Sequence, residues 1–381
     1  MNEPNVDWAV GEVLRGVRIG PVAAGGHWVG RHEGRVVFVR HALEGELADV
    51  RLTGVAARHA FADAQTIADH SPHRVTPPCP VAAVCGGCDT QHVEAGYQRE
   101  VKRQVVAEQM RGIAGLEWRG TVEQVLPAPL GWRRRMRYRR AGATWGLRAK
   151  ASHEVVALPR EGCLIATPGL ARPDAVVLGE TLLGADTADG VVWAEPGSDA
   201  VVRERALGRE WRVRSDGFWQ VHPQAPEVLA AAVMDGLAPA PGERALDLYC
   251  GVGLFAGALV DAGVRVTGVE GGRDAVALAR LNVPQARFHA GSVDRVLRRL
   301  RGGVDLVVLD PPRAGAGRAV MAEILRRGPR AVAYVSCDPA TLARDLATAS
   351  AQGYRVGSLR AFDLFPMTAH VECVAILHPD A

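Results

Sequence analysis

After residue 215 the chain alternates short apolar runs with longer amphipathic segments, and this pattern limits the fold more than any other feature. The apolar runs have the length of strands buried on both faces, and the segments between them can form helices. Residues 215–381 are therefore predicted to form a parallel sheet covered by helices on both sides. The expected strands are 245–249, 264–270, 287–289, 305–309, 331–335, 356–365 and 370–377. The expected helices are 255–262, 274–281, 294–301, 319–327 and 339–352.

Residues 1–214 have a different texture and are predicted to hold two more domains. Residues 1–58 contain short β-type runs, such as 35–40, that are broken by glycines, and these predict an OB-like β-barrel. Residues 59–214 are expected to form a central α+β domain with a helix at 93–111 and several short strands. With 381 residues, of which 48% are apolar and 23% charged, the chain can bury the cores of such a multidomain α/β protein.

The N-terminus gives no sign of export. Residues 1–10 carry Glu3 and Asp7 and lack a basic start followed by an apolar core, and the chain has no apolar run of about 18 residues. A cytoplasmic protein without membrane contact is therefore expected, and it is expected to be a monomer. In that compartment cysteines are more often metal ligands, nucleophiles or core residues than members of disulfides.

A group of arginines is the strongest local charge in the chain. The formal net charge of +3 does not by itself indicate nucleic-acid binding, but residues 133–140 contain six arginines in eight positions. If this stretch is a strand, its side chains alternate between two faces, and one face carries four arginines about 6.6 Å apart. That spacing is similar to the spacing of phosphates, so the stretch predicts contact with a nucleic-acid backbone; a merely solvated face is the alternative. The four arginines are Arg133, Arg135, Arg137 and Arg139.

The first expected strand of the α/β domain runs into a glycine turn and then a helix. Gly251 and Gly253 allow the backbone to pass close to a ligand, and the helix that follows offers free N–H groups. Glu270 ends the next strand, where a carboxylate can accept both hydroxyls of a ribose. The third glycine of a dinucleotide fingerprint is replaced by Ala256. The order Asp247, Gly251, Gly253, Glu270 resembles class I S-adenosylmethionine methyltransferases, which have a Rossmann-like fold; an ordinary tight turn is the alternative.

Two further loops follow strands of the same sheet. Asp310 comes after the fourth strand and Cys337 after the fifth, so both are expected at the carboxyl edge that also carries Gly251. Cys337 precedes the helix 339–352, whose positive end is expected to lower the pKa of the thiol. Cysteine at such a position is alternatively a small buried core residue. Glu372 is the second candidate for chemistry in this region, with a solvated charge as the alternative.

Five stretches give the sequence a strong resemblance to the RNA uracil-5 methyltransferase family, which forms 5-methyluridine in tRNA and ribosomal RNA. The resemblance covers nearly the whole chain, and the N-terminal residues look like a TRAM domain, an RNA-binding barrel. It implies that Gln220, Tyr249 and Glu270 contact S-adenosylmethionine and that Asp310 lies between cofactor and base. In the stretch 291–293 relatives often carry an acidic or amide residue, and Ser292 is assigned to the adenine. The matching stretches are 218–221, 247–253, 310–315, 336–345 and 365–372.

The chemistry of this family explains the two candidate catalytic residues. Uracil C5 is a poor nucleophile until a nucleophile adds to C6, and a thiolate is well suited to that addition. The resemblance makes Cys337 the nucleophile and Glu372 the base that later removes the C5 proton. Cytosine-5 methylation uses a similar addition, but RNA cytosine enzymes typically carry a second cysteine where Arg313 stands here. A catalytically silent iron-sulfur protein that binds RNA is the other alternative.

Four cysteines outside the α/β domain form a candidate metal site. Four thiolates suit either zinc or an iron-sulfur cluster, and their spacing does not decide between the two. The resemblance favours a [4Fe-4S] cluster, because a subgroup of the family carries one on this spacing and residues 89–92 continue the match. No radical S-adenosylmethionine triplet is present, so a structural or RNA-positioning cluster is expected. The four residues are Cys79, Cys85, Cys88 and Cys163.

Overall fold

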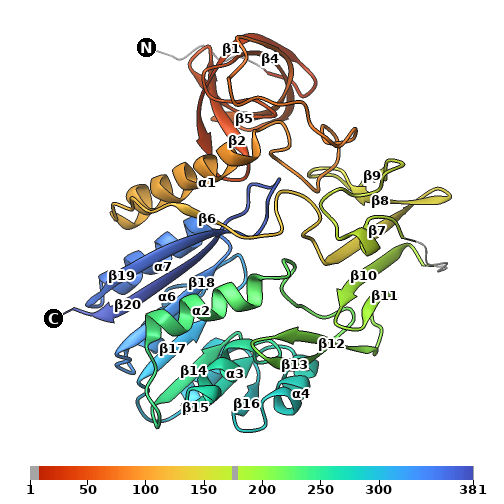
Figure 1. Ribbon diagram of the computed structural model, residues 1–381. Helices are drawn as coiled ribbons and strands as arrows, with labels where there is room; N and C mark the ends of the chain where they lie inside the picture. The colour runs from red at the N-terminus through yellow and green to blue at the C-terminus, as the bar shows by residue number, and fades with distance from the viewer. Residues whose placement is uncertain (1–7, 174–178, 381) are drawn as a thin grey trace.

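The computed structural model describes residues 8–173 and 179–380. It has a barrel at the N-terminus, a central region and a large α/β sheet (Figure 1). Glu3 and Asp7, which entered the expectation about export, lie outside the described residues. None of the described helices is both long and apolar enough to cross a membrane.

The N-terminal domain is a closed five-stranded barrel in the order β1-β2-β3-β5-β4. Alternate side chains such as Val37 and Val39 fill its interior completely. The barrel closes only with β5, so it extends past the boundary expected at residue 58. The sequence pattern concealed this strand because its inward positions include Ala60 and Ala62, which give a weak apolar signal. The strands are β1 (Val13–Ala23), β2 (His27–His32), β3 (Arg35–Arg40), β4 (Leu47–Val55) and β5 (His59–Ala68).

The central region has an apolar core of its own, and some of its elements pack into the cores of its neighbours. Its first part contains α1 (Ala95–Gln109), a π-helical turn η1 (Met110–Ala114) and the short strand β6 (Val122–Gln124). A five-stranded sheet in the order β11-β10-β7-β8-β9 and the hairpin β12–β13 follow. The elements are β7 (Arg135–Ala141), β8 (Thr144–Arg148), β9 (Val155–Ala157), η2 (Pro168–Leu170), β10 (Thr181–Thr187), β11 (Gly190–Ala194), β12 (Val201–Ala206) and β13 (Arg209–Arg214).

The C-terminal sheet has the order β16-β15-β14-β17-β18-β20-β19-β6, with the first five strands parallel and β20 antiparallel to both of its neighbours. All expected strands and helices are present, which confirms the α/β prediction. The strands are β14 (Arg244–Leu248), β15 (Arg265–Glu270), β16 (Arg287–Ala290), β17 (Leu306–Leu309), β18 (Ala331–Ser336), β19 (Tyr354–Asp363) and β20 (Glu372–Pro379). The helices are α2 (Ala225–Leu237), α3 (Leu254–Asp261), α4 (Arg273–Asn282), α5 (Val293–Arg299), α6 (Arg318–Leu325) and α7 (Pro339–Ser350).

Helices cover both faces of this sheet and create two apolar cores. Helices α2, α3 and α4 contribute to one core together with Trp211 of the hairpin β12–β13. Helices α5, α6 and α7 contribute to the other, together with Met110 of η1. The strand β6 pairs with β19 at the sheet edge, so part of the central region completes the α/β domain.

Candidate functional site

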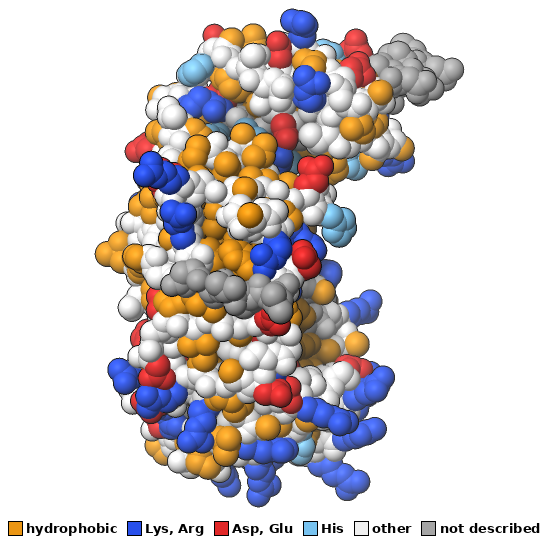
Figure 2. Space-filling view, turned by 90° about the vertical axis from the view of Figure 1, so that its right-hand side faces the viewer, with side chains coloured by type: hydrophobic (Ala, Val, Ile, Leu, Met, Phe, Trp, Pro, Cys, Tyr) orange, Lys and Arg blue, Asp and Glu red, His pale blue; other side chains and the backbone are white. Residues whose placement is uncertain are grey.

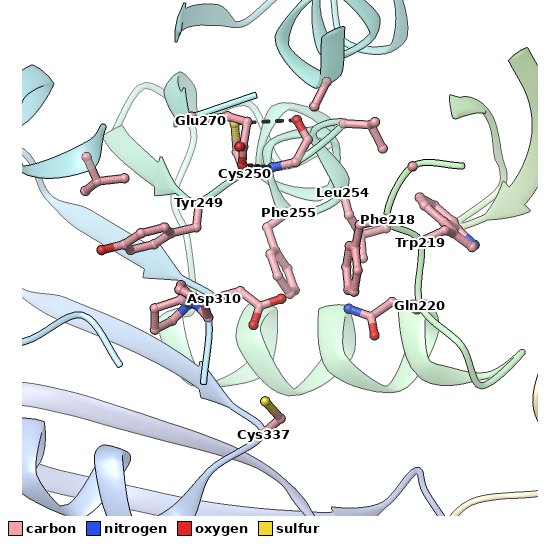
Figure 3. Close-up of a pocket in the computed structure, with 18 of the residues that line it drawn as sticks. Phe218, Trp219, Gln220, Tyr249, Cys250, Leu254, Phe255, Glu270, Asp310 and Cys337 are labelled. Atoms are coloured by element: carbon pink, nitrogen blue, oxygen red, sulfur yellow. Dashed lines mark hydrogen bonds between the residues drawn. The ribbon is translucent and has the colours of Figure 1, made fainter. Parts of the chain in front are cut away.

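The expected site residues meet in one cavity of about 1170 Å³ at the carboxyl edge of the large sheet. Figure 3 shows Glu270 and Cys337 at opposite ends of the view, with Asp310 and Gln220 drawn between them. The lining includes eight of the nine expected residues, namely Gln220, Tyr249, Gly251, Glu270, Ser292, Asp310, Cys337 and Glu372. The ninth, Gly253, does not line it and instead precedes the first residue of α3.

The glycine turn has the backbone conformation that its sequence predicts. Gly251 and Gly253 have φ values of +53° and +98°, in the left-handed region that favours glycine. A Cβ added to Gly251 would meet no atom within 4 Å, whereas one at Gly253 would lie 3.3 Å from Val283. Tyr249 also has a positive φ of +60°, which is strained for a bulky residue and is typical of ligand-binding loops. The turn therefore leaves space beside Gly251 for a ligand.

Glu270 is held in place by the same turn. Its carboxylate accepts a hydrogen bond from the backbone N–H group of Gly251 at 3.1 Å (Figure 3). It accepts a second one from the N–H group of Gly272 at 2.7 Å. These two bonds leave further lone pairs on the carboxylate that can accept from ribose hydroxyls.

An acidic residue that the sequence analysis did not assign, Asp294, lies two positions after Ser292. Asp294 lines the cavity, and the side chain of Ser292 hydrogen-bonds to it and helps to lower the pKa of Asp294. The sequence feature that could have indicated Asp294 is its position as an acidic residue in the first turn of α5, and the sequence analysis did not use this feature.

Cys337 and Glu372 lie close together at the end of two neighbouring strands. Strands β18 and β20 are antiparallel, and Ser336, the last residue of β18, is paired with Cys373. Cys337 follows β18 directly and Glu372 is the first residue of β20, and the charge of Glu372 acts on the Cys337 thiol. The topology thus brings together two residues that are far apart in the sequence.

The electrostatics around Cys337 differ from the expectation. Burial, followed by the nearby Glu372 carboxylate, raises the pKa of the Cys337 thiol to about 11. The helix N-terminus that was expected to lower it is already capped, because Asp338 accepts a hydrogen bond from the Thr341 N–H at 2.9 Å. The prediction of a lowered thiol pKa was therefore wrong: burial and negative neighbours outweigh the helix dipole.

Two buried carboxyls share the same part of the cavity. Burial raises the pKa of Asp310 to about 7. Burial and then the charge of Asp310 raise the pKa of Glu372 well above its ordinary value. Each carboxylate makes ionisation of the other harder, so this region can hold and transfer protons near neutral pH.

Arg313 and His370 form a pair that sequence reasoning did not assign, although both lie in matching stretches. The Arg313 guanidinium lies 3.0 Å from Nε2 of His370, and both residues line the cavity. Burial, followed by the charge of Arg313, lowers the pKa of His370 to about 4, so the ring is neutral. Because a guanidinium can only donate, Nε2 must accept and the ring proton must be on Nδ1. His370 is therefore a neutral N–H donor.

The four expected metal-binding cysteines come together at the edge of the central region. Burial raises the pKa of Cys88 to about 12, the Gln91 side chain lowers it, and the charges of Cys163, Cys85 and Cys79 add smaller increases. Within residues 8–173 and 179–380, no three His, Cys, Asp or Glu side chains are grouped to hold one metal ion. The structure therefore shows neither a zinc site nor an iron-sulfur cluster at these cysteines.

The arginine stretch is more structural than expected. Met136 and Tyr138 of β7 are buried on one face, as alternation predicts. However, Arg134 and Arg135 each bind the buried carboxylate of Glu204 at 2.7 Å. The prediction that Arg135 contacts RNA was therefore wrong, because a buried carboxylate requires a cationic partner.

Comparisons with known proteins agree with this fold. A family model for tRNA (uracil-5-)-methyltransferase matches residues 210–379, and one for the TRAM domain matches residues 7–64. An uncharacterized RNA methyltransferase of Streptomyces avermitilis is 46% identical over 96% of this chain and 98% of its own. A 23S rRNA (uracil(1939)-C(5))-methyltransferase of Alkalilimnicola ehrlichii is 31% identical over 93% of this chain and 94% of its own.

A solved structure is similar over nearly the whole length. The Pyrococcus abyssi tRNA (uracil-54, C5)-methyltransferase, in complex with S-adenosyl-L-homocysteine, has a TM-score of 0.71 and 25% identity. The match covers 96% of this chain and 100% of that one. The fold defines an S-adenosylmethionine-dependent methyltransferase with an N-terminal TRAM barrel. The chain belongs to the RNA uracil-5 methyltransferase family and is an RNA (uracil-5-)-methyltransferase. The cytosine-5 and catalytically silent alternatives are thereby set aside.

Proposed function

We propose that the enzyme methylates uracil through a covalent adduct on Cys337 and that Glu372 removes the C5 proton. The observation that carries this proposal is the placement of Cys337 beside Glu372 in one cavity. As Sγ bonds to C6, the thiol proton leaves and the electron pair of the C5–C6 double bond forms an enolate at O4. Asp310, with a pKa near 7, is suited to accept the thiol proton at neutral pH.

The remaining steps restore the aromatic base. C5 of the enolate attacks the methyl group of the sulfonium, and S-adenosylhomocysteine leaves. Glu372 then takes the C5 proton, and the electron pair of that C–H bond reforms the C5–C6 double bond as the C6–S bond breaks. At the other end of the cavity we assign the ribose to Glu270, the adenine to Ser292 and Asp294, and further cofactor contacts to Gln220, Tyr249 and Gly251.

Covalent trapping tests these roles. RNA with 5-fluorouridine at the target has no C5 proton to remove, so the wild-type enzyme should form a complex that resists denaturation. Cys337→Ala should form none. Glu372→Gln should accumulate a methylated adduct with ordinary RNA, because the release step lacks its base. A stable complex with Cys337→Ala, or rapid turnover by Glu372→Gln, would contradict the assignment.

We propose a uridine of ribosomal RNA as the target. The support is that relatives named as 23S rRNA methyltransferases are 31–33% identical over more than nine-tenths of this chain, against 25% for the tRNA enzyme. Mapping 5-methyluridine in both RNAs of a deletion strain should show a loss in ribosomal RNA. A loss confined to tRNA would refute the proposal. The cytoplasmic location and the monomeric state stay predictions.

We propose a [4Fe-4S] cluster on Cys79, Cys85, Cys88 and Cys163. Each thiolate of such a cluster binds a different iron, and the support for the proposal is the family resemblance together with the electrostatic interaction of Cys88 with the other three cysteines. When bound, it would cross-link the segment 79–88 to Cys163. Anaerobic purification should yield about four irons and four sulfides per chain. One zinc without iron would contradict the proposal.

We propose that RNA next to the target lies on the outer face of β2, β3 and β5. Phe38 and Phe61 stack there at 5.5 Å, and His59 and His27 pack against Phe61 at 5.3 and 5.5 Å. Phe61 is 39% exposed although the barrel core is filled from the other face. Exposed aromatic rings on such a barrel are suited to stacking with unpaired bases.

A further inference from the structure

The segment between β19 and β20, residues 364–371, carries His370 and leads directly into Glu372. We call it the base loop. Figure 1 shows it leaving the sheet toward α1 and the barrel. Met367 within it has a φ of +65°, a conformation that a residue with a side chain adopts only under constraint. The constraint comes from outside the sheet.

Residues beside the cysteine cluster form hydrogen bonds with both the backbone N–H and the backbone carbonyl of Met367. Its N–H donates to Oε1 of Gln98 at 2.9 Å, and its carbonyl accepts from the N–H groups of Asp89 at 2.9 Å and Thr90 at 3.2 Å. The N–H of Ala369 donates to Oδ2 of Asp89 at 3.0 Å. The amide of Gln98 also donates to the Thr90 carbonyl at 3.1 Å, which joins these contacts into one network.

The network is buried and closely packed. Gln98 is 1% exposed. A Cβ at Gly26 of the barrel would lie 2.9 Å from the Asp89 Cβ and 3.1 Å from the Ala369 Cβ, so the barrel turn closes directly over the contact. Lys150 forms an ion pair with the other oxygen of Asp89.

The nucleophile is held by a separate set of contacts. Cys337 follows β18, and the backbone beside it is fixed by the Ser336 hydroxyl, which accepts from the Asp338 N–H at 3.2 Å. Asp338 in turn caps α7. His370 has its own contact with Arg313 at 3.0 Å. A displaced base loop would therefore move Glu372 and leave Cys337 and the contact between His370 and Arg313 in place.

We propose that Asp89 and Gln98 are positioning residues that hold Glu372 in the geometry for removal of the C5 proton. The inference rests on the proposed role of Glu372. The inference assigns one step of the reaction to the segment beside the cysteine cluster. Thiol addition and methyl transfer do not require the contacts of this segment with the base loop, whereas release of the product does. A misplacement of about 1 Å costs a proton transfer roughly ten- to a hundredfold in rate.

Single-turnover kinetics on RNA with tritium at uridine C5 separate methyl transfer from removal of the C5 proton. In the holoenzyme, Gln98→Ala and Asp89→Ala should incorporate methyl from S-adenosylmethionine at a rate within about twofold of wild type. Tritium release should slow ten- to a hundredfold, and a methylated RNA–protein adduct should accumulate. Asp89→Asn keeps an oxygen for the Ala369 N–H and should recover most of the release rate.

Controls keep the outcomes distinct. Gln104→Ala removes the same side chain from the same helix, but Gln104 bonds to Glu100 and should behave as wild type. Equal slowing of methyl transfer and tritium release in a folded, iron-loaded variant would overturn the inference, as would no slowing of either. If Glu372→Gln fails to accumulate the adduct, the proposed role of Glu372 fails instead. If Gln98→Ala does not fold, the comparison of Asp89→Ala with Asp89→Asn decides.

Discussion

At the residue scale, the site combines groups whose environments oppose their ionisation. The cavity buries a thiol between carboxyls, so Cys337 is protonated in the free enzyme, with a pKa near 11. A thiol of this kind is protected from oxidation and reacts only when a bound base and a proton acceptor are in place. The neutral N–H donor of His370, fixed by Arg313, adds a group that can bind the enolate oxygen.

The pH dependence of proton removal follows from the Glu372–Asp310 pair. Glu372 must be ionised to accept a proton, and its pKa is raised, so tritium release should increase with pH until it ionises. Asp310→Asn removes a neighbouring negative charge, so the rise of the release rate with pH should occur about one pH unit lower. Single-turnover release rates between pH 5.5 and 9 measure the shift. Asp294→Asn, at the other end of the cavity, should leave the pH profile unchanged. An unchanged profile in Asp310→Asn would contradict an electrostatic interaction between Asp310 and Glu372.

His370 is expected to stabilise the enolate through Nδ1–H. His370→Ala should slow adduct formation on 5-fluorouridine RNA about a hundredfold, because removing one donor from a developing oxyanion costs this much. His370→Asn retains an N–H donor and should recover part of the rate. Rapid quench-flow experiments analysed on denaturing gels measure the rate of adduct formation. Equal rates in wild type and His370→Ala would exclude this role.

At the element scale, the sequence pattern predicted the strands and helices of the α/β domain to within a few residues, because each of these elements has a clear period. Within the α/β domain, two elements were missed for physical reasons. The helix α2 is buried along much of its length and rich in alanine, so it lacks a polar stripe, and β6 has only three residues, too few to show alternation. The direction of the thiol pKa and the partners of Arg135 depend on tertiary contacts with Glu372 and Glu204, which no local pattern contains.

Helix α1 is attached to the sheet by a buried ion pair. Lys102 lies 2.6 Å from Asp363 at the end of β19, both side chains are almost fully buried, and Lys102 also donates to the Phe365 carbonyl at 2.9 Å. Lys102→Met leaves Asp363 without its cation and should destabilise the protein by about 3–5 kcal/mol. Thermal unfolding should show a fall of several degrees in the midpoint. Arg103→Ala, which breaks an exposed pair with Glu100 on the same helix, should cost less than about 1 kcal/mol. Equal shifts for the two variants would contradict this ranking.

At the scale of the whole molecule, the barrel, the cysteine-bearing segment and the catalytic sheet converge on the base loop. Gly26 of the barrel packs against Ala369, and His27, the next residue, begins the aromatic face of the barrel. An RNA strand can therefore run from the catalytic cavity onto the barrel without crossing a wide gap. Figure 2 shows many Lys and Arg side chains projecting from the lower part of the molecule, where they can attract the phosphate backbone.

The salt dependence of RNA binding distinguishes ionic contacts from stacking contacts. Phe61→Ala should weaken binding of substrate RNA by about five- to 150-fold, corresponding to the roughly 1–3 kcal/mol of one stacked base. The salt dependence should stay unchanged because stacking releases no counterions. Fluorescence anisotropy at several salt concentrations gives both the Kd and its slope. Val13 on β1 is 37% exposed against 39% for Phe61, so Val13→Ala removes a similarly exposed apolar side chain away from the aromatic face and should leave the Kd unchanged. If the two variants bind equally well, the RNA does not stack on this face, and the barrel contributes to binding through charge alone.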